Sequence, residues 1–211
     1  MRETLIPGIS AEKHVAALVV VARDALSRWC GPTCCVSATL AGIDVLRGWG
    51  LKAMPLYTET IAANREWVAG ARTAPAYSVM IGLAEPDREA GIVDNREGDG
   101  FNGHLVIYGK SGSQKFLIDL SAWQMDRPQR RVHVPIAVGI EVDKPCVGLW
   151  AAATTLSDGG LVTYRTHPLA HTREWETSPD WSLTSELHQR AHHGIVHDMR
   201  EYAYAALTAR S

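Results

Sequence analysis

Hydrophobic positions follow a helical spacing at the start and end of the chain and an alternating spacing through much of the middle. A helix is expected from Ser10, which suits a helix N-cap, to about residue 29, because apolar residues recur there every three or four positions. Gly31 and Pro32 interrupt this pattern, and a second helix is expected over 34–47. Its apolar residues cover much of its circumference, which predicts a central position: Val36, Ala38, Leu40, Ile43 and Leu46.

The middle of the chain reads mainly as strands. Leu51–Tyr57 is expected to be a strand, placed at a sheet edge because Pro55 cannot donate a backbone hydrogen bond. A further helix is expected over 58–75, and residues 84–102 read as an exposed loop. Alternating hydrophobicity predicts further strands at Tyr77–Leu83, His104–Lys110, Lys115–Leu120, Val132–Glu141, Val147–Thr154 and Leu161–Arg165.

This order of elements predicts the fold class. Helices come first, an antiparallel β-sheet follows, and a last helix over 184–210 closes the chain, which is an α+β plan. A length of 211 residues is that of one ordinary domain, so we expect residues 1–211 to form a single domain with a real hydrophobic core.

A predicted hairpin brings two chemically important side chains together. Residues 110–114 form a short polar segment with Gly112 where a tight turn needs a positive φ. If Ser111-Gly112 is a two-residue turn, His104 lies directly opposite Asp119, with Cβ atoms about 5 Å apart. An imidazole and a carboxylate so placed are the base and orienting groups of a nucleophile–base–acid triad.

Cysteines at the start of the second helix can supply the nucleophile. Cys34 and Cys35 are both candidates, because backbone N–H groups and the helix dipole favour a thiolate at a helix N-terminus. The same N–H groups can stabilise the oxyanion of a tetrahedral intermediate. Cys30 and Cys146 are expected to be small apolar side chains of the interior.

Three short motifs resemble those of a known superfamily. They are the segment from Cys35 to Leu51, the Gly103-His104-Leu105-Val106 segment and the segment from Leu117 to Ser121. In order and spacing they resemble the papain-like superfamily, in its transglutaminase-like and arylamine N-acetyltransferase-like branch. The resemblance implies a central helix that bears the cysteine and packs on an antiparallel sheet.

The resemblance also implies a chemistry. It suggests cysteine-dependent acyl transfer, or amide or thioester hydrolysis, through an acyl-enzyme. Cys35 would be the nucleophile, His104 the base and then the acid, and Asp119 the residue that orients His104. The residues that follow Cys35 match the superfamily pattern better than those that follow Cys34, so Cys35 is preferred. Trp123, just after Asp119, is a candidate to line the substrate site or, equally, to cap the sheet edge.

Other functions fit parts of the sequence. One is a peptidase in the strict sense, and another is a non-catalytic binding protein on the same scaffold. A third is metal binding through the last helix, where two histidine pairs have i,i+4 spacing: His188 with His192, and His193 with His197. No metal ligand set has the order of a known zinc motif, so we expect neither a metal nor an organic cofactor.

The composition of the chain limits the classes of binding partner and the locations that we expect. A formal net charge of −2 gives no electrostatic argument for binding nucleic acid or an anionic membrane. Apolar residues make up 46% of the chain, but the longest apolar run is too short to span a bilayer. The four cysteines include an adjacent pair that suits a disulfide framework poorly, so a reducing, cytoplasmic location is expected. A peptide, amide or other acyl donor is the expected substrate.

Overall fold

The computed structural model describes residues 9–30, 35–71, 73–81, 92–94, 103–135, 138–142, 151–166, 176 and 183–209. The helices are α1 Ala11–Ser27, α2 Cys35–Gly48, α3 Arg65–Val68 and α4 Glu186–Thr208. The strands are β1 Lys52–Ala63, β2 Ser78–Ile81, β3 Ile92–Asp94, β4 His104–Ser111, β5 Gln114–Asp119, β6 Val138–Glu141, β7 Ala151–Thr155 and β8 Leu161–Thr166. Two 3₁₀ helices follow β5, η1 Ala122–Met125 and η2 Pro128–Arg130. The chain is therefore α+β, with a mainly antiparallel sheet and a C-terminal helix.

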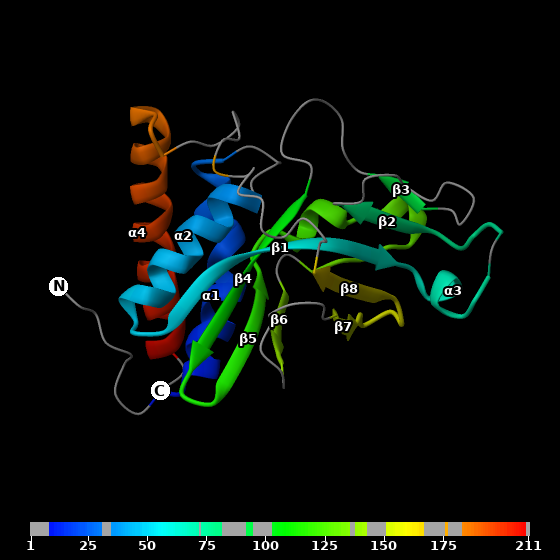
Figure 1. Cartoon of the computed structure of the whole chain (residues 1–211), viewed down its shortest axis with the longest axis horizontal. Helices are drawn as coiled ribbons and strands as arrows, with labels where there is room; N and C mark the ends of the chain where they lie inside the picture. Colours follow the sequence, from blue (N-terminus) through cyan, green and yellow to red (C-terminus); the bar gives the residue numbers. More distant parts are fainter. Residues whose placement is uncertain are drawn as a thin grey trace.

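The long strand β1 organises the sheet (Figure 1). Thr58 of β1 pairs with His104 of β4 and also with Thr166 of β8, so β4 and β8 lie on opposite edges of β1. The second half of β1 pairs with both β8 and β2, which places β2 after β4 along the same edge. β5 and β6 extend the sheet beyond β4, β7 pairs with β8, and β3 runs parallel to β2.

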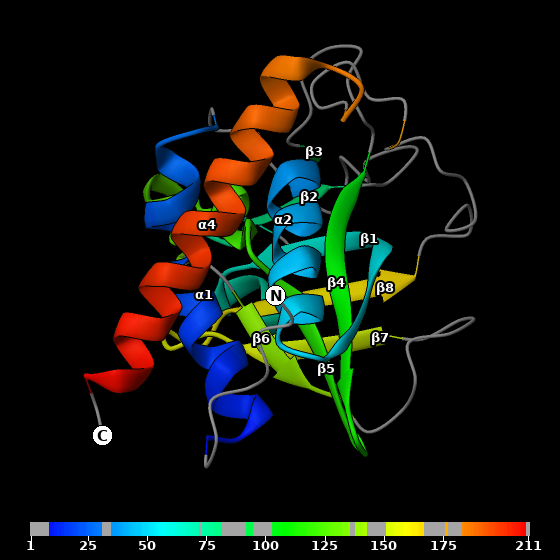
Figure 2. The ribbon, with the colours of Figure 1, turned by 90° about the vertical axis from the view of Figure 1, so that its left-hand side faces the viewer.

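The three long helices gather on one side of the sheet (Figures 1 and 2). Their apolar side chains pack with those of alternate sheet positions, including Leu105, Ile107 and Ile118, and form one hydrophobic core. The other sheet face has a second core that includes Val106, Leu117 and Tyr164. Successive residues of β4 and β5 therefore serve different cores, as the alternation of a buried strand requires.

The predicted first and last helices are confirmed. Ser10 is the N-cap of α1, and its hydroxyl accepts a hydrogen bond from the backbone N–H of Lys13. Helix α4 lies within the predicted range 184–210. It buries side chains spaced four residues apart against α1 and α2: Ala191, Ile195, Met199 and Ala203.

The helix expected over 58–75 is wrong. Strand β1 continues through this region to Ala63, and only the short helix α3 follows it. Hydrogen bonds to β2 and β8 on both sides outweigh the local preference of this segment. Pro55 was expected at a sheet edge, and in the described residues the first part of β1 pairs only with β4.

The hairpin exists, but its predicted register is wrong. Ser111 pairs with Gln114, so the turn residues are Gly112 and Ser113 instead of Ser111 and Gly112. Gly112 has a φ of 58° at the first turn position, where a type II′ turn places glycine. The shift moves the pairing by two residues, so Asp119 stays on the face of His104 but lies diagonal to it.

Other predicted segments are shorter or fall partly outside the described residues. Of the strand expected over Val132–Glu141, the described residues form β6 at its end, and Val132 makes an isolated bridge with Arg127. In the predicted loop 84–102, residues 92–94 form β3 and the others are not described. Cys34, Cys146 and the first part of the strand expected over Val147–Thr154 also lie outside the described residues. Among the helices that are described, none is long and apolar enough to cross a membrane.

Candidate active site

His104 and Asp119 form a buried pair at the ends of β4 and β5. The Nε2 atom of His104 donates a hydrogen bond to Oδ2 of Asp119 over 2.7 Å, and both side chains are 0% exposed. The diagonal placement across the antiparallel pair is within reach of a histidine side chain. The pairing predicted for these two residues is therefore present, although they are not directly opposite.

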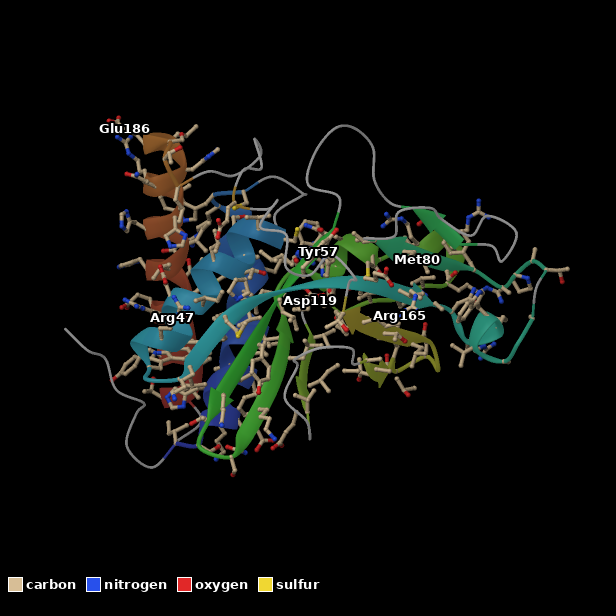
Figure 3. All side chains as sticks on the ribbon, viewed as in Figure 1. Arg47, Tyr57, Met80, Asp119, Arg165 and Glu186 are labelled. Carbon is tan, nitrogen blue, oxygen red and sulfur yellow. The ribbon has the colours of Figure 1, made fainter. Side chains whose placement is uncertain are left out.

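Asp119 receives further hydrogen bonds from buried donors. The backbone N–H and the hydroxyl of Ser121 donate to Oδ1, at 2.9 and 3.3 Å. The hydroxyl of Tyr164 donates to Oδ2 over 3.0 Å, so this oxygen is shared between Tyr164 and His104. A buried carboxylate needs such donors to remain ionised. Figure 3 labels Asp119 near the middle of the molecule.

Helix α2 brings Cys35 toward the start of β4. Cys35 is half-buried and packs against the core on the helical side of the sheet. One turn later, the hydroxyl of Thr39 donates to the backbone carbonyl of Leu105 over 2.8 Å, and both residues are buried. This hydrogen bond connects the first turns of α2 to the residue that follows His104.

The second ring nitrogen of His104 faces different surroundings. Nδ1 is buried and makes no well-formed hydrogen bond with any residue that the structure describes. Burial alone would lower the pKa of His104, but the charge and hydrogen bond of Asp119, with smaller contributions from Cys35, raise it to about 10. The imidazole therefore carries a proton at neutral pH, and Cys35 is near enough to influence its charge.

Close packing fixes the backbone just before His104. Gly103 lies against the ring of Tyr57, and a Cβ atom added to Gly103 would overlap that ring. Thr58 pairs with His104 across β1 and β4, and its hydroxyl donates to the backbone carbonyl of His104 over 3.2 Å. These contacts hold the start of β4 against β1 and leave His104 little freedom to move.

Trp123, the predicted substrate-binding residue, lies in η1 after Asp119. Its side chain is half-buried and packs against the core on the helical side, which fits the structural alternative. Its indole N–H is buried and has no hydrogen-bond partner among the described residues. A role in binding substrate stays a prediction.

Two histidines of the last helix contact acidic side chains. His192 is buried and its Nε2 donates to Oδ2 of Asp44 on α2 over 2.9 Å. His197 contacts its neighbour Asp198 over 3.3 Å. No group of three or more histidine, cysteine or acidic side chains that could hold a metal ion occurs among the described residues.

Sequence reasoning missed two residues of the site. Ser121 was recognised as part of a motif but not as a ligand of Asp119, although a serine two residues after an aspartate commonly makes such local hydrogen bonds. Tyr164 lies 45 residues beyond Asp119, and no spacing rule connects them. Its position follows only from the pairing of β8 with β1.

We compared the chain with protein-family models, characterised proteins and solved structures, and none of the three comparisons found a match.

Proposed function

We propose that the chain is a cysteine-dependent enzyme that resembles the papain-like superfamily in its transglutaminase-like and arylamine N-acetyltransferase-like branch. It would transfer an acyl group, or hydrolyse an amide or thioester, through an acyl-enzyme on Cys35. The reaction assigned to the site uses no metal or organic cofactor. The observation that carries the proposal is the buried imidazole of His104, which is held by Asp119 through one nitrogen and influenced by Cys35 from its surroundings.

In the first half-reaction, the thiolate of Cys35 attacks the carbonyl carbon of the acyl donor. The carbonyl electron pair moves to oxygen, and backbone N–H groups at the start of α2 are suited to stabilise this oxyanion. When the tetrahedral intermediate collapses, the bond to the leaving group breaks and the His104 imidazolium gives its proton to that group. A thioester on Cys35 and a neutral His104 remain.

In the second half-reaction, His104 acts as a base. It takes a proton from water or from an amine, which attacks the thioester carbonyl. Collapse of the second intermediate releases the acid or the new amide and restores the Cys35 thiolate with a protonated His104. Asp119 stays ionised throughout and stabilises the imidazolium whenever it forms.

The proposal is tested by the reactivity of Cys35. Alkylation by iodoacetamide should be measured from pH 5 to 9 with site-resolved mass spectrometry, in the wild type and in His104→Ala. We expect Cys35 to react rapidly already at pH 6, where an ordinary cysteine with a pKa of about 8.5 reacts slowly. The His104→Ala variant should lose this rapid reaction at pH 6 but approach the wild-type rate at pH 9.

The chain offers internal controls for this measurement. Cys30 in the same protein reports general accessibility, and His133→Ala removes an exposed histidine by the same substitution. Acetylation by p-nitrophenyl acetate, followed by detection of a hydroxylamine-sensitive adduct on Cys35, then tests the acyl-enzyme itself.

Two outcomes would contradict the proposal. If Cys35 reacts like Cys30 at every pH, the chain is better described as a binding protein on this scaffold. If Cys34 carries the rapid reaction, Cys35 is not the nucleophile.

A further inference from the structure

We infer that Tyr164 is a positioning residue of this site: its hydroxyl holds the Asp119 carboxylate in the orientation that receives the N–H of His104. This inference rests on the proposed function, because it assigns Tyr164 a part in the chemistry of Cys35 and His104. It extends the site from α2, β4 and β5 to β8, a strand from a distant part of the sequence.

The argument begins with the hydrogen bonds of Asp119. Each carboxylate oxygen has two donors, so the four acceptor positions of the ionised group are used. Both donors to Oδ1 come from Ser121, which is on the same local segment. Ser121 alone fixes one oxygen but leaves the other to be placed by its own partners.

Tyr164 supplies the fixed donor for the second oxygen. It lies on β8 opposite Thr60 of β1, two residues from Thr58, which pairs with His104. Residues of these paired strands that are an even number of positions apart share a face, so the tyrosine and the histidine approach Asp119 from the same side. Tyr164 is fully buried and belongs to the core on that face, which leaves its ring no room to turn away.

The protonation state of Tyr164 fits a donor and excludes a base. Burial raises its pKa well above the usual value of 10.0, and the charge of Asp119 and the hydrogen bond to it act in the same direction. The hydroxyl therefore keeps its proton at every pH at which the protein would work. Because it cannot accept a proton from Cys35 or His104, its contribution is the hydrogen bond to Oδ2.

Removal of this hydroxyl has a defined consequence. One oxygen of a buried carboxylate would lose one of its two donors, which leaves the carboxylate freer to rotate. A rotated Asp119 supports the His104 imidazolium less well. The reaction of Cys35 at low pH, which depends on that imidazolium, would then slow.

The test is the pH profile of Cys35 alkylation by iodoacetamide in Tyr164→Phe. We expect the rate at pH 6 to fall about tenfold, the size that a lost hydrogen bond to a charged group produces, and the difference to vanish by pH 9. Tyr202→Phe is the matched control, because it removes a buried hydroxyl that has no hydrogen-bond partner among the described residues. Its profile should equal that of the wild type.

A double-mutant cycle separates positioning from general support of the fold. In an Asp119→Ala background, Tyr164→Phe should have no further effect on the alkylation rate, because the group that it orients is gone. If Tyr164→Phe folds poorly, 3-fluorotyrosine at position 164 provides the opposite change. A more acidic hydroxyl donates more strongly and should move rapid alkylation to lower pH.

The possible failures can be told apart. If wild-type Cys35 shows no rapid alkylation at pH 6 and no dependence on His104, the proposed function and this inference both fail. If the wild type behaves as proposed but Tyr164→Phe has an unchanged or faster profile, the positioning role alone is overturned. The positioning role would also be overturned if Tyr164→Phe lowered the alkylation rate equally at all pH values, or lowered it in the Asp119→Ala background. Tyr164 would then only support the core.

Discussion

His104 combines two properties that conflict in a purely structural residue. It is completely buried, which opposes a positive charge, and it is nevertheless protonated at neutral pH because Asp119 compensates for the lost water. Nδ1 of His104 makes no well-formed hydrogen bond with the described residues, a feature that it shares with Nδ1 of His192, so the raised pKa and the influence of Cys35 distinguish His104. The residues packed around His104 hold its ring in place.

Gly103→Ala tests how strictly the backbone before His104 must be held. The new methyl group would overlap the buried ring of Tyr57, so we expect the free energy of unfolding to fall by about 1–3 kcal/mol. We also expect slower alkylation of Cys35 at pH 6, because relief of the overlap displaces His104. Chemical denaturation and site-resolved alkylation measure the two effects.

Gly109→Ala is the matched control on the same strand. A Cβ atom at Gly109 would have its nearest contact with Ile118 at 3.6 Å, which is an ordinary packing distance. If Gly103→Ala is no more destabilising than Gly109→Ala, or leaves the alkylation profile unchanged, the packing against Tyr57 does not position His104.

At the scale of secondary-structure elements, the sequence predicts the features that depend on the local pattern of residues. The helix cap at Ser10, the last helix and the β4–β5 hairpin follow from spacing and turn residues, and all three are present. The register of the hairpin could not be fixed, because Ser111-Gly112 and Gly112-Ser113 both place glycine in the turn. Both choices keep His104 and Asp119 on one face, so the predicted contact between these two side chains is present despite the wrong register.

The remaining differences arise from contacts between distant segments. Residues 58–63 become a strand because β2 and β8 flank them, and neither neighbour can be recognised from the local sequence. Tyr164 reaches Asp119 through the same β1–β8 pairing. The pair of β4 and β5 was therefore predictable, whereas the residue that completes the surroundings of Asp119 was not.

The attachment of α4 to α2 gives a prediction at this scale. The hydrogen bond from His192 lowers the pKa of Asp44, partial burial opposes this, and the charges of His192, Arg47 and Arg200 assist it. A carboxylate with a lowered pKa stabilises the fold above its ordinary pKa of 3.8 and loses this contribution as the pH falls through the folded value. We expect Asp44→Asn to destabilise the protein by up to about 1 kcal/mol at pH 7, because the pair is half-exposed.

Urea denaturation of the wild type and Asp44→Asn between pH 7 and pH 3 checks this. The difference in the free energy of unfolding between the wild type and Asp44→Asn should be constant down to about pH 4 and then shrink. Asp24→Asn, on the exposed side of α1, removes the same charge as a control. Equal curves for the two variants would mean that the His192–Asp44 contact does not stabilise the attachment of α4.

The whole molecule places its candidate site where its two cores meet. Cys35 belongs to the helical side, while His104, Asp119 and Tyr164 share the opposite face of the sheet. The Thr39–Leu105 hydrogen bond attaches α2 to the start of β4. The site therefore requires both faces of the sheet to be packed, and its protonation state is coupled to the stability of the whole fold.

This coupling predicts a specific pH dependence of stability. The pKa of His104 is raised from 6.5 to about 10, so its contribution to the free energy of unfolding is complete below pH 6.5 and declines as the pH rises toward 10. The wild type should lose stability over this window relative to His104→Gln, a neutral side chain that can still donate to Asp119. His133→Gln, at an exposed position, should follow the wild-type curve.

Because Cys35 contributes to the raised pKa of His104, the same comparison in a Cys35→Ala background should show a decline that ends at lower pH. If the stability of the wild type relative to His104→Gln stays constant or grows with pH, His104 is neutral in the folded protein. The thiolate–imidazolium chemistry would then have no proton donor.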